Sequence, residues 1–271
     1  MFHLRSGEVS ASLYERLYWR KTSWKRLNRD NRSKTVSLFL RRLSAARLFG
    51  AILLIVVAQI GFYKTYLQFF PQFEGFRYVQ HFHGAMMMGW LIMLLVQPIL
   101  ILAGNFKLHR LLGRASYLLA PLVLVSMFWI SRFRYKGILE SSGQVAAVAH
   151  LALNVPNIVF FAVLYWLTIL YRHRTELHMR FMVSTVFVLV GPGLARVLIG
   201  HMAFSLADAV SVVRTITPLI TCVIKVADSM RTKRISPFAL VFGFMVLHTV
   251  LWEARKTPFW QTLGSVLAQL F

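Results

Sequence analysis

Residues 83–102 read HGAMMMGWLIMLLVQPILIL, twenty residues without a charged side chain. A helix needs about 20 mostly apolar residues to cross the hydrocarbon core of a bilayer. Pro98 within the run is compatible with a span, because membrane bundles tolerate kinked helices. This stretch therefore predicts a membrane-spanning helix.

Similar apolar runs recur along the chain. The composition agrees with this pattern, since 57% of the 271 residues are hydrophobic, 15% are charged and the mean hydropathy is +0.59. A soluble domain averages about 25% charged residues, and a disordered chain has low hydrophobicity. The sequence therefore predicts an all-α integral membrane bundle over residues 49–271. We expect seven transmembrane helices, at residues 49–69, 82–103, 113–131, 146–170, 180–201, 207–227 and 237–254.

Basic residues predict the orientation of this bundle. The chain holds 31 Lys and Arg against 9 Asp and Glu, a formal charge of +22. If the N-terminus is cytoplasmic, 21 basic residues lie on the cytoplasmic side and 6 lie outside. Cytoplasmic segments carry the excess of Lys and Arg in membrane proteins. We therefore expect a multi-pass protein of a bacterial inner membrane with its C-terminus outside.

The N-terminal arm, residues 1–48, holds 12 of the basic residues and 3 acidic ones. Its apolar and aromatic residues recur at spacings of three and four, which is typical of an amphipathic helix on a membrane surface. We expect this arm to contact anionic lipids of the cytoplasmic leaflet. No nucleic-acid-binding signature accompanies the charge, so we expect no nucleic-acid partner. The single cysteine, Cys222, excludes a disulfide framework.

Four of the nine histidines show a repeated spacing. His109 follows His83 by 26 residues, and His178 follows His150 by 28 residues. This weak repeat places His83 and His150 near the outer surface, and His109 and His178 near the inner surface. Two opposed imidazoles from different helices are the ligands of a b-type haem iron. The alternative is that each histidine hydrogen-bonds a helix end or a lipid headgroup.

Polar residues share helix faces with two of these histidines. Gln97 lies on the face of His83, and Asn154 and Asn157 lie on the face of His150. Polar side chains within a span avoid lipid. We therefore expect all three to point into the bundle.

Charged residues interrupt several of the predicted spans. Each costs at least a few kcal/mol unless it is paired. We expect Arg196 to pair with Asp208 and Asp228 to pair with Lys225, three residues away. Arg214 has no local partner in the sequence. If it has none in the fold, we expect an anionic ligand there: a haem propionate, a lipid phosphate or a substrate.

Two loop motifs carry a resemblance. They read Leu108-His109-Arg110 before Gly113-Arg114, and His178-Met179-Arg180-Phe181-Met182. With His83-Gly84, Trp90, Gln97, Pro192 and Arg196, they resemble a family of uncharacterised bacterial multi-pass membrane proteins over roughly residues 75–265. That resemblance implies the fold and conveys little about function.

A second resemblance concerns function. Four histidines over four successive spans are similar to the di-haem b-type cytochromes of the transmembrane ascorbate and ferric reductase kind. This resemblance implies one haem b between His83 and His150, and another between His109 and His178.

Three functions follow as hypotheses. The first is transmembrane electron transfer through one or two b-type haems, with a quinone or a partner membrane subunit as electron source. In that case the chain is a haem-dependent membrane oxidoreductase. The second is a transporter or a lipid- or anion-binding membrane protein. The third is a cofactor-free accessory or assembly subunit of a membrane complex.

Overall fold

The computed structural model describes residues 52, 53, 55–233 and 236–271, and this part of the chain contains no strand. The predicted arm at residues 1–48 lies outside the described residues. Residues 55–63 are helical. The elements that follow are η1 (Leu67–Phe69), α2 (Tyr78–Leu102), α3 (Phe106–Leu170), α4 (Thr175–Ser184), α5 (Val186–Met202), α6 (Leu206–Thr232), α7 (Phe238–Glu253), η2 (Ala254–Lys256) and α8 (Pro258–Ala268).

Five helical stretches in the described part are long and apolar enough to cross a membrane. The prediction of a helical protein with several helices long and apolar enough to cross a membrane is therefore confirmed for the described residues. Six of the predicted spans fall on these five stretches, because α3 contains two of them. The predicted span at 49–69 lies only partly within the described residues, so the count of seven stays a prediction. The five stretches are Tyr78–Leu102, Phe106–Leu170, Thr175–Met202, Leu206–Thr232 and Phe238–Lys256.

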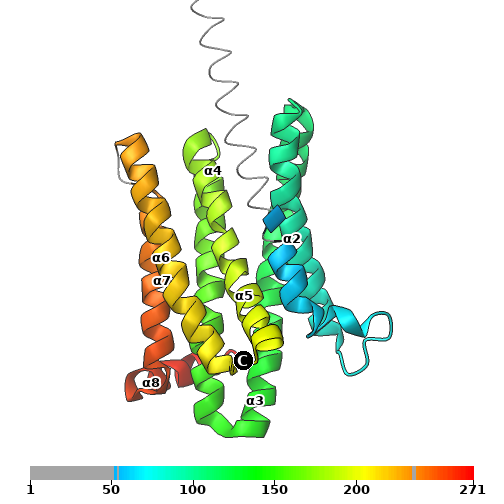
Figure 1. Cartoon of the computed structure of the whole chain (residues 1–271), viewed down its shortest axis with the longest axis vertical. Coiled ribbons are helices and arrows are strands. Elements are labelled where there is room, and N and C mark those ends of the chain that lie inside the picture. The colour runs from blue at the N-terminus through cyan, green and yellow to red at the C-terminus, as the bar shows by residue number, and fades with distance from the viewer. Residues whose placement is uncertain (1–51, 54, 234–235) are drawn as a thin grey trace, which may run out of the picture.

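The long helix α3 folds back on itself at Gly143. This residue has φ of 80° and ψ of 177°, a conformation that glycine adopts without a steric penalty because it has no Cβ. The two arms of α3 therefore run antiparallel, side by side, and the turn between them lies at one end of the bundle (Figure 1). We call this the turn end. Residues 132–142 continue the first arm beyond the span predicted at 113–131.

A break in the predicted span 180–201 separates α4 from α5 at Thr185. The hydroxyl of Thr185 donates to the Met182 carbonyl at 2.7 Å and accepts from the Trp90 indole at 3.1 Å. Threonine side chains that bond back to a carbonyl of the preceding turn bend helices. The sequence Gly191-Pro192-Gly193 is a stronger local candidate for a break, yet α5 continues through Pro192.

Aromatic residues fill the space between α2 and the second arm of α3. The Trp90 ring meets Phe161 edge-on, with 5.0 Å between ring centroids, and Tyr165 at 5.7 Å. On the other side of the arm, Phe160 stacks on Phe244 of α7 at 3.6 Å. Trp90, Phe160 and Phe161 are almost completely buried. These contacts hold α2, α3 and α7 together.

Candidate functional site

In the outer predicted pair, no described hydrogen bond or ring contact joins His83 to His150. The Ser126 hydroxyl donates to the Val123 carbonyl at 2.7 Å, so it accepts from Nδ1 of His83 at 3.2 Å. Nε2 of His83 then carries the lone pair. His150 lies on the second arm of α3, whereas Ser126 lies on the first arm.

Apolar and aromatic side chains pack next to the outer pair. Trp90 packs on Phe161, and α2 runs parallel to the second arm of α3. His83 precedes Trp90 by seven residues, and Asn154 precedes Phe161 by seven, so His83 and Asn154 lie at the same level of the two parallel helices. His150 lies one further turn, or about 6 Å, along its helix. Met87 packs against the same buried cluster as Phe161. The haem prediction stays a prediction, which the reduced-minus-oxidised absorption spectrum of the purified protein tests.

The inner predicted pair lies closer together. His109 in the first turn of α3 and His178 in α4 are near enough for their charges to interact. Nδ1 of His178 donates to the Thr168 carbonyl at 2.9 Å. Nδ1 of His109 is buried without a hydrogen-bond partner, as is Oε1 of Gln97. No group of three or more His, Cys, Asp or Glu in the described residues is arranged to hold a metal ion.

The predicted polar face is buried to different degrees. Asn157 is buried, and its amide donates to the Leu153 carbonyl of its own helix at 3.2 Å. Asn154 and Gln97 are half-buried. The amide nitrogen of Gln97 meets the Met93 sulfur at 3.7 Å. These three side chains do not converge on one another in any described contact.

Arg196 lies in α5, toward the turn end, and has no acidic partner among the described residues. Its Nη1 donates to the Thr65 hydroxyl at 3.1 Å, and its guanidinium lies over the Phe62 ring at 4.5 Å. Its charge reaches His83 of α2 and Arg134 of α3. Arg196, Arg134 and His83 therefore form a cluster of positive and ionisable groups, which we call the Arg196 site.

Close helix packing positions the groups that contact Arg196. A Cβ added to Gly61 would collide with the carbonyl oxygen of Gly193 and would approach the Arg196 side chain. Small residues let membrane helices approach closely. The helix at 55–63 therefore packs tightly on α5, and this contact places Phe62 and Thr65 beside the guanidinium.

An aromatic cluster fixes the segment that follows Thr65. The Tyr66 hydroxyl donates to Nδ1 of His81 at 2.5 Å. Its ring meets those of Phe73 and Phe76, with centroids 5.0 Å and 5.2 Å away. The cluster ties the segment before α2 to the start of α2.

Arg214 is buried in α6 and pairs with a histidine rather than with an acid. Its Nη1 donates to Nδ1 of His248 at 2.6 Å, and Nε2 of His248 donates to the Leu153 carbonyl at 3.1 Å. His248 is completely buried, and Nε of Arg214 has no partner. No described carboxylate pairs with Arg214, and the anionic ligand expected there stays a prediction.

Asp208 does not pair with Arg196, contrary to expectation. It lies in the first turn of α6, where its backbone N–H donates to the Ser205 hydroxyl at 3.1 Å. The same hydroxyl lies 2.6 Å from the Asp208 carboxylate. Serine is a favoured residue before a helix because it satisfies such free N–H groups. Asp208 therefore stabilises the start of α6, and its side chain is exposed.

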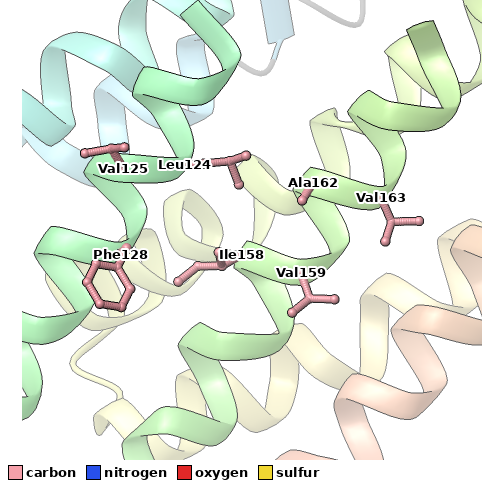
Figure 2. Close-up of a pocket in the computed structure, with 7 residues that line it drawn as sticks. All are labelled: Leu124, Val125, Phe128, Ile158, Val159, Ala162 and Val163. Carbon is pink, nitrogen blue, oxygen red and sulfur yellow. The ribbon is translucent and has the colours of Figure 1, made fainter. Parts of the chain in front are cut away.

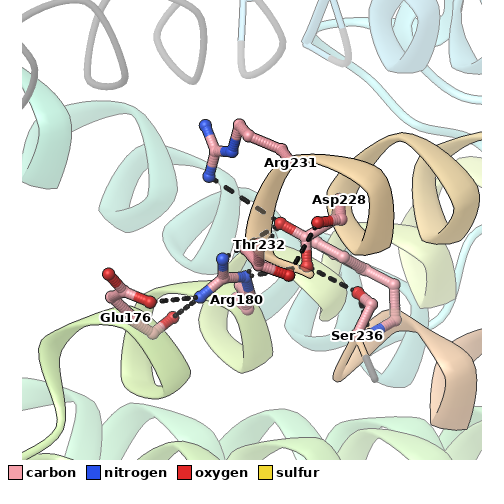
Figure 3. A network of polar contacts seen from close by, with 7 residues as sticks. Glu176, Arg180, Asp228, Arg231, Thr232 and Ser236 are labelled. Carbon is pink, nitrogen blue, oxygen red and sulfur yellow. Dashed lines mark hydrogen bonds and ion pairs between the residues drawn. The ribbon is translucent and has the colours of Figure 1, made fainter. Parts of the chain in front are cut away.

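Asp228 forms a buried network that the sequence analysis missed (Figure 3). Arg180 of α4 donates to its carboxylate from Nε at 3.1 Å and from Nη2 at 3.0 Å. Ser236 donates to it at 2.6 Å, and Glu176 pairs with Arg180 at 3.2 Å. Lys225, the partner expected for Asp228, instead lies over the Phe242 ring at 4.8 Å. The network joins α4, α6 and the start of α7.

One signal for this network is present in the sequence. Asp228 is an acidic residue at the end of an apolar segment, and such a residue requires a cation when it is buried. Several arginines satisfied that requirement equally well in the sequence, and only the folded chain places Arg180 beside it. Comparison with known proteins adds no further constraint: no family model, curated protein or solved structure matches this chain.

Proposed function

We propose that this chain is a multi-pass membrane protein that binds an anionic group, a phosphate or a carboxylate, at the Arg196 site. The observation that carries the proposal is a contrast between two arginines. Arg180 lies against two carboxylates, at 3.0 Å and 3.2 Å. No described carboxylate pairs with Arg196. A bound anion supplies the negative charge that pairs with Arg196.

The energetic argument rests on the cost of an unpaired charge in a membrane helix. That cost is about 2.5–3.5 kcal/mol for an arginine at the helix centre and is smaller toward the helix ends, where Arg196 lies. The Thr65 hydroxyl satisfies one of the five guanidinium N–H groups, and the Phe62 ring covers one face. The planar fork of the remaining donors matches the two oxygens of a phosphate or carboxylate.

Neighbouring groups favour the same kind of ligand. Arg134 adds a second positive charge within range of Arg196. His83, whose Nδ1 donates to the Ser126 hydroxyl, has Nε2 available to accept a hydrogen bond from a ligand hydroxyl. Three separate helical segments contribute these groups, so the site lies between helices rather than on one surface.

The ligand has two chemical sources that an experiment separates. One is the phosphate of an anionic lipid headgroup, and the other is a small soluble anion. The proposed orientation puts the Arg196 site near the outer leaflet, since basic residues are concentrated at the opposite end of the helices. Both sources are accessible there.

Thermal unfolding of the detergent-purified protein, followed by tryptophan fluorescence, tests the proposal. The probes are inorganic phosphate, acetate, short-chain phosphatidylglycerol and short-chain phosphatidylcholine. A ligand at 100 times its Kd stabilises the folded state by about 2.7 kcal/mol. We expect at least one anionic probe to raise Tm, the zwitterionic lipid to raise it less, and Arg196→Gln to remove the difference.

The matched control is Arg172→Gln, which removes an exposed arginine at the other end of the bundle. It should respond to the anion as the wild type does. If only the lipid probe acts, the source is a headgroup, and if phosphate acts as well, the source is soluble. Equal responses of wild type and Arg196→Gln, or no response to any anion, would overturn the proposal.

A further inference from the structure

An apolar groove runs between the two arms of α3 (Figure 2). Its volume is about 520 Å³ and it opens to the outside of the bundle. Three of its lining residues lie on the first arm and four on the second, and none has a polar side chain. They are Leu124, Val125, Phe128, Ile158, Val159, Ala162 and Val163.

The position of this groove decides what can fill it. Val125 and Val159 are each 52% exposed at its edges, and both arms belong to a helix that is apolar enough to cross a membrane. Water is excluded from an apolar space at that depth, so a hydrocarbon chain or an apolar side chain occupies it in the bilayer. The volume falls within the range of pockets that hold small ligands.

Basic residues lie in line with the groove on the first arm. Arg132 follows Val125 by seven residues, which is two helical turns, and Lys136 follows by one turn more. Residues at this spacing share one face of a helix. Both side chains are exposed, and neither is joined to a carboxylate in the described part of the chain.

The spacing along the helix matches one leaflet. At 1.5 Å per residue, Arg132 lies about 10 Å from Val125 toward the turn end, and Lys136 about 16 Å. Half the thickness of a bilayer's hydrocarbon core is about 15 Å. An acyl chain in the groove therefore brings its headgroup phosphate to the level of these two cations. A helix from a partner protein has no comparable need for them.

We propose that this groove and the Arg132–Lys136 pair form a binding site for one phospholipid with an anionic headgroup, from the leaflet nearest the α3 turn. The acyl chain lies along the groove and the phosphate contacts the two cations. Arg134 of the Arg196 site lies on the same arm of α3, but two residues from Arg132 and therefore on about the opposite face of the helix, so the two sites are separate. This proposal stands whether or not an anion binds at Arg196.

Native mass spectrometry of the detergent-solubilised protein tests this proposal. The probes are phosphatidylglycerol and phosphatidylcholine of equal chain length, added in a titration. Each basic side chain near an anionic lipid surface contributes about fivefold to affinity. We expect phosphatidylglycerol to bind more tightly than phosphatidylcholine, and the double variant R132Q/K136Q to lose roughly 25-fold of that affinity.

Two further variants make the outcome specific. K107Q/R110Q removes two exposed basic residues at the other end of the same arm and should leave binding unchanged. Ala162→Trp fills the groove and should weaken both lipids. The proposal fails if wild type binds both lipids equally, or if K107Q/R110Q lowers phosphatidylglycerol binding as much as R132Q/K136Q. It also fails if Ala162→Trp converts a stable dimer into a monomer, because a second copy then occupies the groove.

Discussion

Three buried or partly buried arginines of one bundle have three different kinds of partner. Arg180 pairs with carboxylates, Arg214 with a neutral histidine ring, and Arg196 with a hydroxyl and an aromatic face. Removing one member of a buried ion pair leaves an uncompensated charge, which costs more than the pair itself contributes. At the residue scale, we therefore expect the Arg180–Asp228 pair to be more sensitive to substitution than the exposed ion pairs of the described residues.

We expect Asp228→Asn to destabilise the folded protein by about 3–5 kcal/mol. The substitution keeps the shape of the side chain but removes the charge that faces Arg180, and the remaining acid, Glu176, is 75% exposed. Thermal unfolding followed by tryptophan fluorescence measures the loss. Glu253→Gln is the control, since Glu253 is 62% exposed and lies 3.8 Å from Arg255, and such a pair is worth under about 1 kcal/mol. Equal Tm shifts for the two variants contradict the prediction.

Element-scale packing depends on where helices approach without side chains between them. Gly61 and Gly193 bring the helix at 55–63 against α5, so the position of Thr65 depends on a backbone contact. Gly243 in α7, by contrast, has open space around its Cα. We therefore expect an added methyl group to lower the stability of the protein at Gly61 and not to lower it at Gly243.

We expect Gly61→Ala to lower the free energy of unfolding by about 1–3 kcal/mol, the usual cost of overpacking. The added Cβ meets a backbone carbonyl, which cannot rotate away as a side chain can. Gly243→Ala should instead leave stability unchanged or raise it by up to about 1 kcal/mol, because alanine favours a helix over glycine. Thermal unfolding of both variants in one detergent compares them. A stable Gly61→Ala would show that the helix at 55–63 is not held on α5 by this contact.

At the scale of the whole molecule, the sequence predicted what is local and repetitive. Apolar runs of span length located the helices, and this prediction is confirmed for the described residues. The break at Thr185 escaped prediction because one of the two contacts of its hydroxyl is with Trp90, 95 residues earlier. Glycine and proline at 191–193 gave a stronger local signal, yet α5 continues through them.

Pairings across the bundle could not be predicted for the same physical reason. Arg180 and Asp228 lie 48 residues apart, and Arg214 and His248 lie 34 apart. Which residues meet depends on the order in which the helices pack and on their register, and neither is encoded in spacing along one helix. The four histidines illustrate this, since the similar spacings of 26 and 28 residues do not specify which helices pack side by side.

Orientation is the whole-molecule property that the charge distribution predicts, and labelling tests it. The bias of 21 to 6 basic residues predicts the α3 turn outside the cell and the loop between α2 and α3 inside. Ser142 and Lys107 are exposed at these two ends, and Cys222 is the one cysteine to be replaced first. In intact cells, a membrane-impermeant maleimide should label Ser142→Cys and spare Lys107→Cys, and cell lysis should make both reactive.

The reverse labelling pattern would mean that the orientation is inverted. It would then place the Arg132–Lys136 pair in the cytoplasmic leaflet, where anionic lipids are abundant. Labelling of both sites in intact cells would mean that the two ends of the first arm lie on one side, and α3 would not cross the membrane as two antiparallel arms.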